Sequence, residues 1–193
     1  MANGLGNQEV ENQSRGFSSL KEQARLLTAD MSSEQFVWKP EVQKWSVGEC
    51  LEHLNVVGGK LLPAIRQAID RGHRDGIVAE PPFTYGFISR AFVRGNEPSS
   101  RWKMKTFRAY QPAPAAKLEK EPVLKDFMEL QDAFIEQVKR SDGLDLRRIR
   151  VASPAVRLLR LSLGAWFSAT VAHEKRHLEQ AHRVTQDPGF PVE

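Results

Sequence analysis

Helical periodicity dominates this sequence of 193 residues. In four stretches the apolar residues recur at steps of three and four, which places them along one face of a helix. The stretches are 14–31, 46–71, 121–141 and 163–186. No convincing alternating pattern of a strand accompanies them. Because an amphipathic helix must bury its apolar face against another element, the sequence predicts an all-α fold, a four-helix bundle.

The bundle is predicted to contain one long connection. Residues 73–120 separate the second helix from the third, with a short amphipathic helix expected around 85–93. A connection of this length is more often functional than idle. The polar residues 1–13 are expected to form a flexible N-terminus and 188–193 a C-terminal tail, which leaves 14–187 as a single domain.

Composition narrows the cellular setting. No window of about 18 apolar, uncharged residues is present, so no transmembrane helix is expected. The first residues have neither a cationic start nor an apolar run, so no secretory signal is expected. The single cysteine, Cys50, cannot form an internal disulfide and fits a reducing compartment. We therefore expect a cytoplasmic protein without membrane association.

The charge balance is mildly basic, with a formal net charge of +4. Positive residues concentrate in residues 90–108 and 139–160. Patches of this kind can attract an anionic small substrate or an acidic partner. Because no recognised nucleic-acid-binding motif accompanies them, we expect no nucleic-acid partner.

Three of the five histidines predict a metal site. His173 and His177 are four residues apart, so both imidazoles lie on one side of the last helix. That pair alone fits equally well a hydrogen-bonded pair in the core. His53, on the inward face of the second helix, adds a third imidazole from a neighbouring helix. Three histidine ligands leave an open position, typical of a catalytic site, and suit zinc or nickel.

Other residues near this pattern favour structural roles. His73 is expected to be exposed to solvent, and His182 to lie as a cation in the last helical turn. Cys50 is more typical of a small core residue than of a fourth ligand. Glu49 follows Ser46 by three residues, so a capping box is favoured over a role beside the histidines.

A competing motif overlaps the histidine pair. Residues 173–177 read HEKRH, which matches the H-E-x-x-H pattern of zinc metalloproteases with Glu174 as general base. The longer form of that pattern needs glycine and histidine where this chain has Gln180 and Arg183. No strand is predicted that would hold an extended peptide. A zinc hydrolase is therefore the less favoured hypothesis.

Two segments carry a resemblance to a known family. Residues 45–54 read WSVGECLEHL and residues 173–180 read HEKRHLEQ, similar to a W-S-x-G-E motif with a following histidine and to a later H-x-x-x-H-x-x-Q motif. In these motifs and in helix order over 14–187 the chain resembles the DinB/YfiT-like metalloenzyme superfamily, in particular its DinB_2 branch. The resemblance implies a four-helix bundle that binds one divalent ion through His53, His173 and His177.

The resemblance also implies chemistry that the residues alone do not. It indicates kinship with thiol S-transferases that use bacillithiol or mycothiol and with related isomerases, and a homodimer. We therefore expect a small-molecule substrate and a low-molecular-weight thiol as cofactor; the catalytic residues stay unassigned. A metal would hold the thiol as thiolate. The alternative is a non-catalytic stress-related or binding protein with a structural or empty metal site.

The long connection offers candidates for an anionic thiol cofactor. Tyr85, Arg90, Arg94 and Arg101 could contact it. A role as solvated surface is favoured for these residues, because exposed charges rarely need a partner.

Overall fold

All four predicted helices are present in the structure, a computed structural model that describes residues 7–101, 106–156 and 158–192. Within these ranges no helix is both long and apolar enough to cross a bilayer. Residues 1–6 of the predicted flexible terminus lie outside the described residues, as do Lys103, Lys105 and Arg157 of the two basic stretches.

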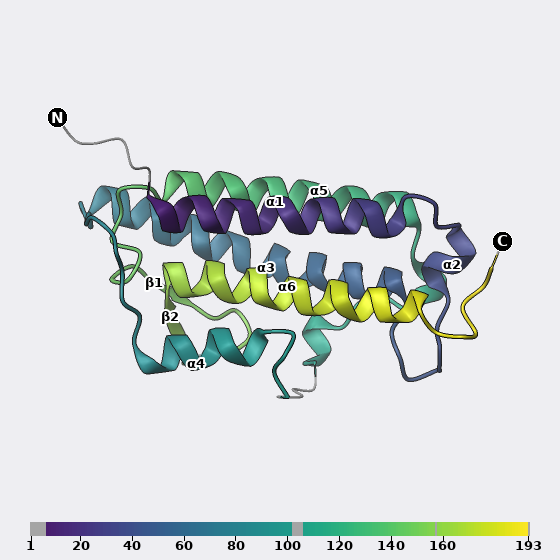
Figure 1. The fold of residues 1–193 in the computed structure, drawn as a ribbon. Coiled ribbons are helices and arrows are strands. Elements are labelled where there is room, and N and C mark those ends of the chain that lie inside the picture. The colour runs from purple at the N-terminus through teal and green to yellow at the C-terminus, as the bar shows by residue number, and fades with distance from the viewer. Residues whose placement is uncertain (1–6, 102–105, 157, 193) are drawn as a thin grey trace.

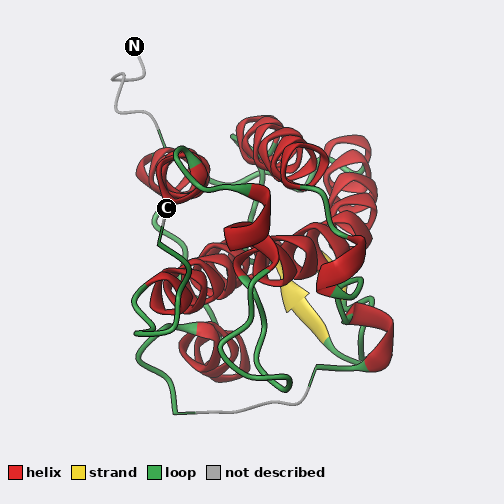
Figure 2. Ribbon diagram, turned by 90° about the vertical axis from the view of Figure 1, so that its right-hand side faces the viewer, coloured by secondary structure: helices red, strands yellow, loops and turns green. Residues whose placement is uncertain are grey.

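The four long helices form a bundle, which confirms the predicted fold class. They are α1 (Gln8–Thr28), α3 (Val47–Arg74), α5 (Lys120–Arg140) and α6 (Leu163–Thr185). Each packs against two others in the ring order α1–α5–α3–α6 (Figure 1). The end-on view shows the helices around a shared interior (Figure 2). Because α3 and α6 are neighbours, residues far apart in the sequence can meet between them.

The centre of the bundle is aromatic. Phe17 of α1 stacks on Phe134 of α5 with ring centroids 4.9 Å apart, and meets Phe167 of α6 edge-on at 6.5 Å. All three side chains are fully buried. Offset and edge-to-face pairs of this kind stabilise a core beyond their buried area. They join three of the four helices of the bundle.

The first helix begins earlier than predicted. It starts at Gln8, capped by the Asn7 side chain, so the prediction of a flexible terminus is wrong for residues 8–13. Val10 and Gln13 are buried, and the Gln13 side chain donates a hydrogen bond to the Gly164 carbonyl at 3.3 Å. The polar composition of this stretch does not indicate a helix, because its contact with α6 forms only in the folded protein.

The second long helix also continues past its predicted end. The periodic stretch predicts a helix that ends at about residue 71, but α3 continues through Pro63 and runs on to Arg74. Gly72 is buried where the Ile149 side chain approaches the backbone closely. The left-handed turn comes at Gly76, with φ of +59°. This glycine ends the helix because its conformation is strained for other residues.

The long connection contains the short helix predicted around 85–93, here α4 (Phe87–Asn96), which packs on the outer side of α6. The other short elements were not predicted. They are α2 (Ser33–Val37), the 3₁₀ turns η1 (Arg108–Tyr110) and η2 (Ala115–Lys117), and the strands β1 (Arg150–Ala152) and β2 (Arg160–Ser162).

The two strands correct the expectation that the chain has none. They pair antiparallel in a hairpin between α5 and α6, with Val151 opposite Leu161. Both of these residues are fully buried. Strands of three residues are too short to show an alternating pattern, and they form here because their apolar residues pack on the bundle. The hairpin lies beside the first turns of α6 (Figure 1).

The predicted C-terminal tail is packed against α2 over its described part. Phe190 meets Trp38 edge-on at 5.5 Å, and the Gln35 side chain donates a hydrogen bond to the Pro191 carbonyl at 2.8 Å. These contacts hold the chain end close to the last turns of α6.

Adjacent glycines in α3 provide a test of the helix packing. A methyl group on Gly58 would lie 2.5 Å from Leu130 Cδ2 of α5, whereas one on Gly59 meets nothing within 4 Å. We expect Gly58→Ala to destabilise the protein by about 1–3 kcal/mol through overpacking. Gly59→Ala should stabilise it by about 0.5–1 kcal/mol through helix propensity. Urea unfolding of both variants measures this, and equal shifts would contradict the packing of α3 on α5.

Candidate metal centre

The start of α3 fixes the first histidine. The Ser46 side chain accepts a hydrogen bond from the Glu49 backbone N–H at 3.0 Å, and the Glu49 carboxylate accepts one from the Ser46 N–H at 2.9 Å. Lys39 pairs with the same carboxylate at 3.1 Å. The predicted capping box is confirmed, and Glu49 is occupied by it. The box sets where α3 begins, so His53, two turns later, faces α6.

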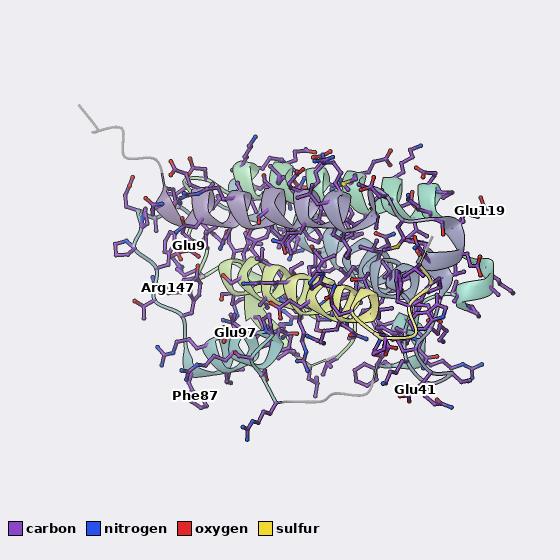
Figure 3. The ribbon with its side chains drawn as sticks, turned by 45° about the vertical axis from the view of Figure 1, so that its right-hand side comes forward. Glu9, Glu41, Phe87, Glu97, Glu119 and Arg147 are labelled. Atoms are coloured by element: carbon purple, nitrogen blue, oxygen red, sulfur yellow. The ribbon has the colours of Figure 1, made fainter. Side chains whose placement is uncertain are left out.

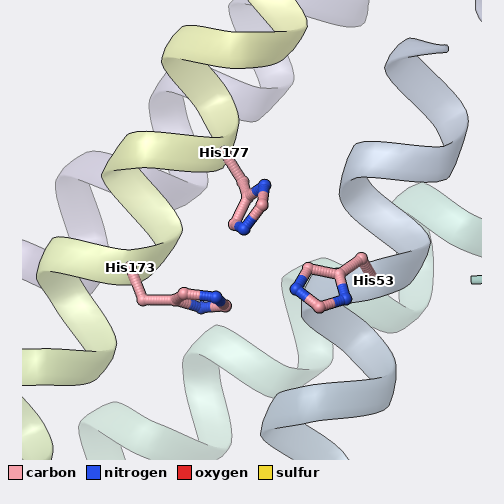
Figure 4. Close-up of side chains that lie close together, drawn as sticks. All are labelled: His53, His173 and His177. Carbon is pink, nitrogen blue, oxygen red and sulfur yellow. The ribbon is translucent and has the colours of Figure 1, made fainter. Parts of the chain in front are cut away.

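The three predicted histidines converge. One ligand nitrogen from each of His53, His173 and His177 lies within 4.8 Å of the other two. The ring centroids are 4.6 Å apart for His53–His177 and for His173–His177, and 5.3 Å for His53–His173. Figure 4 shows the rings of α3 and α6 pointing toward one another. Their convergence is confirmed; the bound ion stays a prediction.

Hydrogen bonds orient two of the rings. His53 Nδ1 lies 2.7 Å from the Tyr110 carbonyl oxygen, and His177 Nδ1 lies 3.1 Å from Gln180 Oε1. Since both partners are acceptors, each Nδ1 carries the hydrogen and donates it. Each Nε2 therefore keeps its lone pair, which is the state that a metal-ligating histidine needs.

The spacing fits a single ion. For three atoms that are no more than 4.8 Å apart, a central point lies within about 2.8 Å of each, against about 2.0–2.1 Å for a Zn–N bond. Ring movements of under about 1 Å would therefore complete the coordination. Three neutral nitrogen donors from two rigid helices are a donor set suited to zinc or nickel.

Burial keeps the histidines neutral. Removal from water lowers the pKa of His53, and it lowers the pKa of His173 to about 3. The pKa of His177 is also well below its usual value, first because of burial and then because of the other two histidines. Neutral imidazole is the form that binds metal, so no proton has to be displaced near pH 7.

Three residues at this site were not predicted as site residues. The Trp45 ring is stacked 5.7 Å from His177 and lies 4.9 Å from His53. The Tyr110 carbonyl and the Gln180 side chain orient the rings, as above. The sequence contained a signal for two of them: Trp45 is the first residue of the motif at 45–54, and Gln180 is the last residue of the motif at 173–180. Tyr110 follows from no local pattern.

A cavity of about 950 Å³ opens beside the cluster. All three histidines line it, together with Trp45 and other side chains of α3, α4 and α6. Its cationic lining residues are Lys44, Arg176 and Arg183.

The candidates offered for an anionic cofactor lie off the cavity, and the three arginines are exposed, as the favoured interpretation expected. The residues are Tyr85, Arg90, Arg94 and Arg101, and none of them lines this cavity. The Tyr85 hydroxyl instead donates to Glu9 of α1. Their position in the long connection gave no information on which way its turns would face.

The remaining candidates lie away from the cluster. Cys50 is fully buried, and burial raises the pKa of its thiol. The group of potential ligands does not include it, so it is a core residue as favoured. His73 and His182 are exposed, as expected.

Glu174, the acid of the HEKRH segment, is 1% exposed. No described residue hydrogen-bonds its carboxylate oxygens, although the Gln131 side chain of α5 is close by. Burial raises the pKa of Glu174 to about 8. At neutral pH the acid is therefore largely protonated, which does not suit it to act as a general base.

Comparison with protein families decides the relationship. The model of the DinB superfamily, DinB_2, matches residues 18–181. The chain belongs to the DinB superfamily. Searches of the curated proteins and of the solved structures find no significant match. The matched segment of this DinB-superfamily chain includes both motifs and all three clustered histidines.

Removing one histidine should flatten the acid sensitivity of the metal-free protein. Because the folded-state pKa of His173 is lowered, the unfolded state binds more protons once the pH drops toward and below 6.5, so the stability of the protein decreases as the pH decreases. The slope is up to about 1.4 kcal/mol per pH unit for each such group. In EDTA, the Tm of His173→Ala should fall less than that of wild type between pH 7 and pH 5. The exposed His182→Ala is the control, and parallel profiles for all three proteins would contradict the buried, neutral cluster.

Glu174→Gln should have the opposite pH signature. A carboxyl whose pKa is raised to about 8 in the folded state costs stability progressively as pH rises from about 4.5 to 8. The amide has the same shape and does not ionise. The Tm difference between Glu174→Gln and wild type should therefore grow in favour of the variant from pH 5 to pH 8.5. A Tm difference that does not change with pH would contradict the prediction that ionisation of Glu174 destabilises the folded protein.

Proposed function

We propose that this DinB-superfamily protein is a divalent-metal-dependent enzyme that transfers a low-molecular-weight thiol to an electrophilic small molecule. The observation that carries the proposal is a cluster of three neutral imidazoles in the wall of a large cavity. His53, His173 and His177 would hold the ion, with zinc or nickel as the metals best suited to them.

The cluster leaves room for an exogenous ligand. Closed structural zinc sites use four protein ligands, whereas catalytic sites keep one position open. Among the described residues, the group contains three histidines and no cysteine or carboxylate. A bound divalent ion would lower the pKa of a thiol ligand, so that the thiol is present as the more nucleophilic thiolate.

The chain's own nucleophiles are unsuited to replace that thiol. Cys50 is buried, with a raised thiol pKa. Two of the hydroxyls that line the cavity are engaged within the protein: Thr170 donates to the Trp166 carbonyl at 2.8 Å, and Ser153 accepts from two backbone N–H groups. This favours a reaction in which a bound small molecule supplies the nucleophile.

The surrounding residues support binding and orientation. The Tyr110 carbonyl and Gln180 hold two rings with Nε2 turned away from them, and Trp45 covers the cluster. Lys44 and Arg183 lie in the same cavity and carry charge of the right sign for the carboxylate that small physiological thiols commonly bear.

His177→Ala should remove both metal binding and activity, with His182→Ala as the matched control on the same helix. We expect wild type and His182→Ala to bind one zinc or nickel ion per chain by mass spectrometry of the dialysed protein. At an ion concentration of 100 Kd, binding should raise stability by about 2.7 kcal/mol. His177→Ala should lose at least about tenfold in affinity, as loss of a metal-site residue commonly does.

The enzymatic activity is measured with the same two variants. Metal-loaded protein is mixed with cysteine and 1-chloro-2,4-dinitrobenzene, and the absorbance of the thioether is followed. In this reaction the cysteine thiol loses its proton to the buffer, the thiolate forms the new S–C bond, and the C–Cl bond breaks as chloride leaves with the electron pair. Wild type and His182→Ala should exceed His177→Ala. A metal that raises Tm while no thiol and electrophile pair is turned over would instead support the non-catalytic alternative.

A further inference from the structure

The cavity extends well beyond the histidines. Its lining follows α6 from Trp166 to Val184 and continues to Asp187 just beyond the helix, with His173 and His177 between these ends. From His173 back to Trp166 is seven residues, or about 10 Å along the helix axis. We call this part the apolar arm. It is enclosed by α4, the β1–β2 hairpin and the first half of α6, and its lining includes Phe92, Pro154, Val156, Leu159, Trp166 and Ala169.

Polar groups of the apolar arm are already used inside the protein. Trp166 Nε1 donates to the Val151 carbonyl at 3.0 Å, and Thr170 Oγ1 to the Trp166 carbonyl at 2.8 Å. The Asn96 side chain donates to the Phe92 carbonyl at 2.8 Å. The Ser153 hydroxyl caps the turn that follows it. A polar ligand entering here would lose its water without replacement, whereas an apolar ligand gains by burial.

The opposite end of the cavity differs in character. Gln43, Lys44, Arg183 and Asp187 line it, around the last turns of α6. Arg183 is exposed, and Lys44 pairs with Glu41 at 2.6 Å. Charged groups therefore line the cavity around the last turns of α6, and the lining around its first half is mainly apolar, with Glu174 and Arg176 at the level of the histidines. A ligand that spans the cluster meets two unlike environments.

We infer that the electrophilic substrate carries an extended apolar group, an alkyl chain or an aromatic ring, that occupies the apolar arm while its reacting atom faces the histidines. The inference rests on the proposed function for the reaction and on the lining of the apolar arm for the substrate class. The polar end is left for the thiol. Phe92 and Leu159 then determine specificity, because they bound the arm from two different elements outside the four-helix ring.

A series of alkyl hydroxamates tests the substrate class. Acetohydroxamate and its longer homologues butanohydroxamate, hexanohydroxamate and octanohydroxamate share one metal-binding group and differ only in the length of the alkyl chain. We expect their affinity for zinc-loaded wild type, measured by calorimetry, to rise by up to about fourfold per buried methylene. The rise should stop once the chain has filled the arm. An affinity that does not change from acetohydroxamate to the longest homologue would overturn the inference.

Matched variants locate the effect. Phe92→Ala and Leu159→Ala remove side chains that line the arm. Phe87→Ala on the same helix and Leu158→Ala in the same hairpin remove side chains that are 77% and 91% exposed. Figure 3 shows Phe87 at the outer edge of the molecule. The first two variants should weaken octanohydroxamate at least about fivefold and leave acetohydroxamate unchanged, whereas the two controls should change neither. Equal effects of lining and control variants would contradict the assignment.

A second probe separates this inference from the proposed function. If the protein binds no zinc, acetohydroxamate will not bind either, and the proposed function fails. The arm is then tested in the metal-free protein with 1-butanol, 1-hexanol and 1-octanol, followed by the NMR shift of the Trp166 indole N–H. Affinity that increases with chain length in wild type and is reduced in Leu159→Ala supports an apolar ligand site. Shifts that are absent, or equal in Leu159→Ala, would overturn it.

Discussion

The contact between α3 and α6 is the constraint on which the chemistry of this protein depends. It buries three imidazoles against one another, and buried polar groups are tolerated only when their hydrogen-bonding capacity is used. Two of the rings meet this demand through Nδ1, by donating to Tyr110 and Gln180. Their second nitrogens face inward without a proton. A shared cation would satisfy what the helices leave open.

The same contact sets the electrostatics. Burial disfavours charge on each ring, and for His173 and His177 the neighbouring histidines add repulsion to this effect. All three pKa values are lowered as a result. Glu174, one residue beyond His173, responds to the same dry environment in the opposite direction, and its pKa rises to about 8. Burial therefore keeps the histidines and the neighbouring glutamic acid uncharged. A protonated Glu174 differs from the ionised general base that the H-E-x-x-H protease motif requires.

What the sequence predicts well is what repeats along a helix. The four long helices, the capping box at Ser46 and the direction of His53, His173 and His177 all follow from steps of three and four residues or from one cap. Helical spacing alone predicts that His173 and His177 lie together. That His53 lies beside them depends on α3 and α6 being neighbours in the bundle, which the family motifs supported. Residues 8–13 were misread because Gln13 and Glu9 gain their partners only in the folded protein, Gln13 at the Gly164 carbonyl of α6 and Glu9 at the Tyr85 hydroxyl.

The rest depends on tertiary contacts that leave no local signal. The Tyr110 carbonyl reaches His53 across 57 residues of sequence, and a backbone group has no side-chain pattern to reveal it. The arginines of the long connection carried the right charge, but they lie off the cavity because α4 places its apolar residue Phe92 against Trp166 instead, with ring centroids 5.4 Å apart.

The long helices and the connections have different roles because they contribute differently to the stability of the fold. The bundle needs its regular helices to bury a core, and they supply the ligands. The connections contribute less to that core, and they build the cavity wall around the histidines. In the proposed function, substrate selection is therefore carried by the segments whose structure the sequence predicts least well.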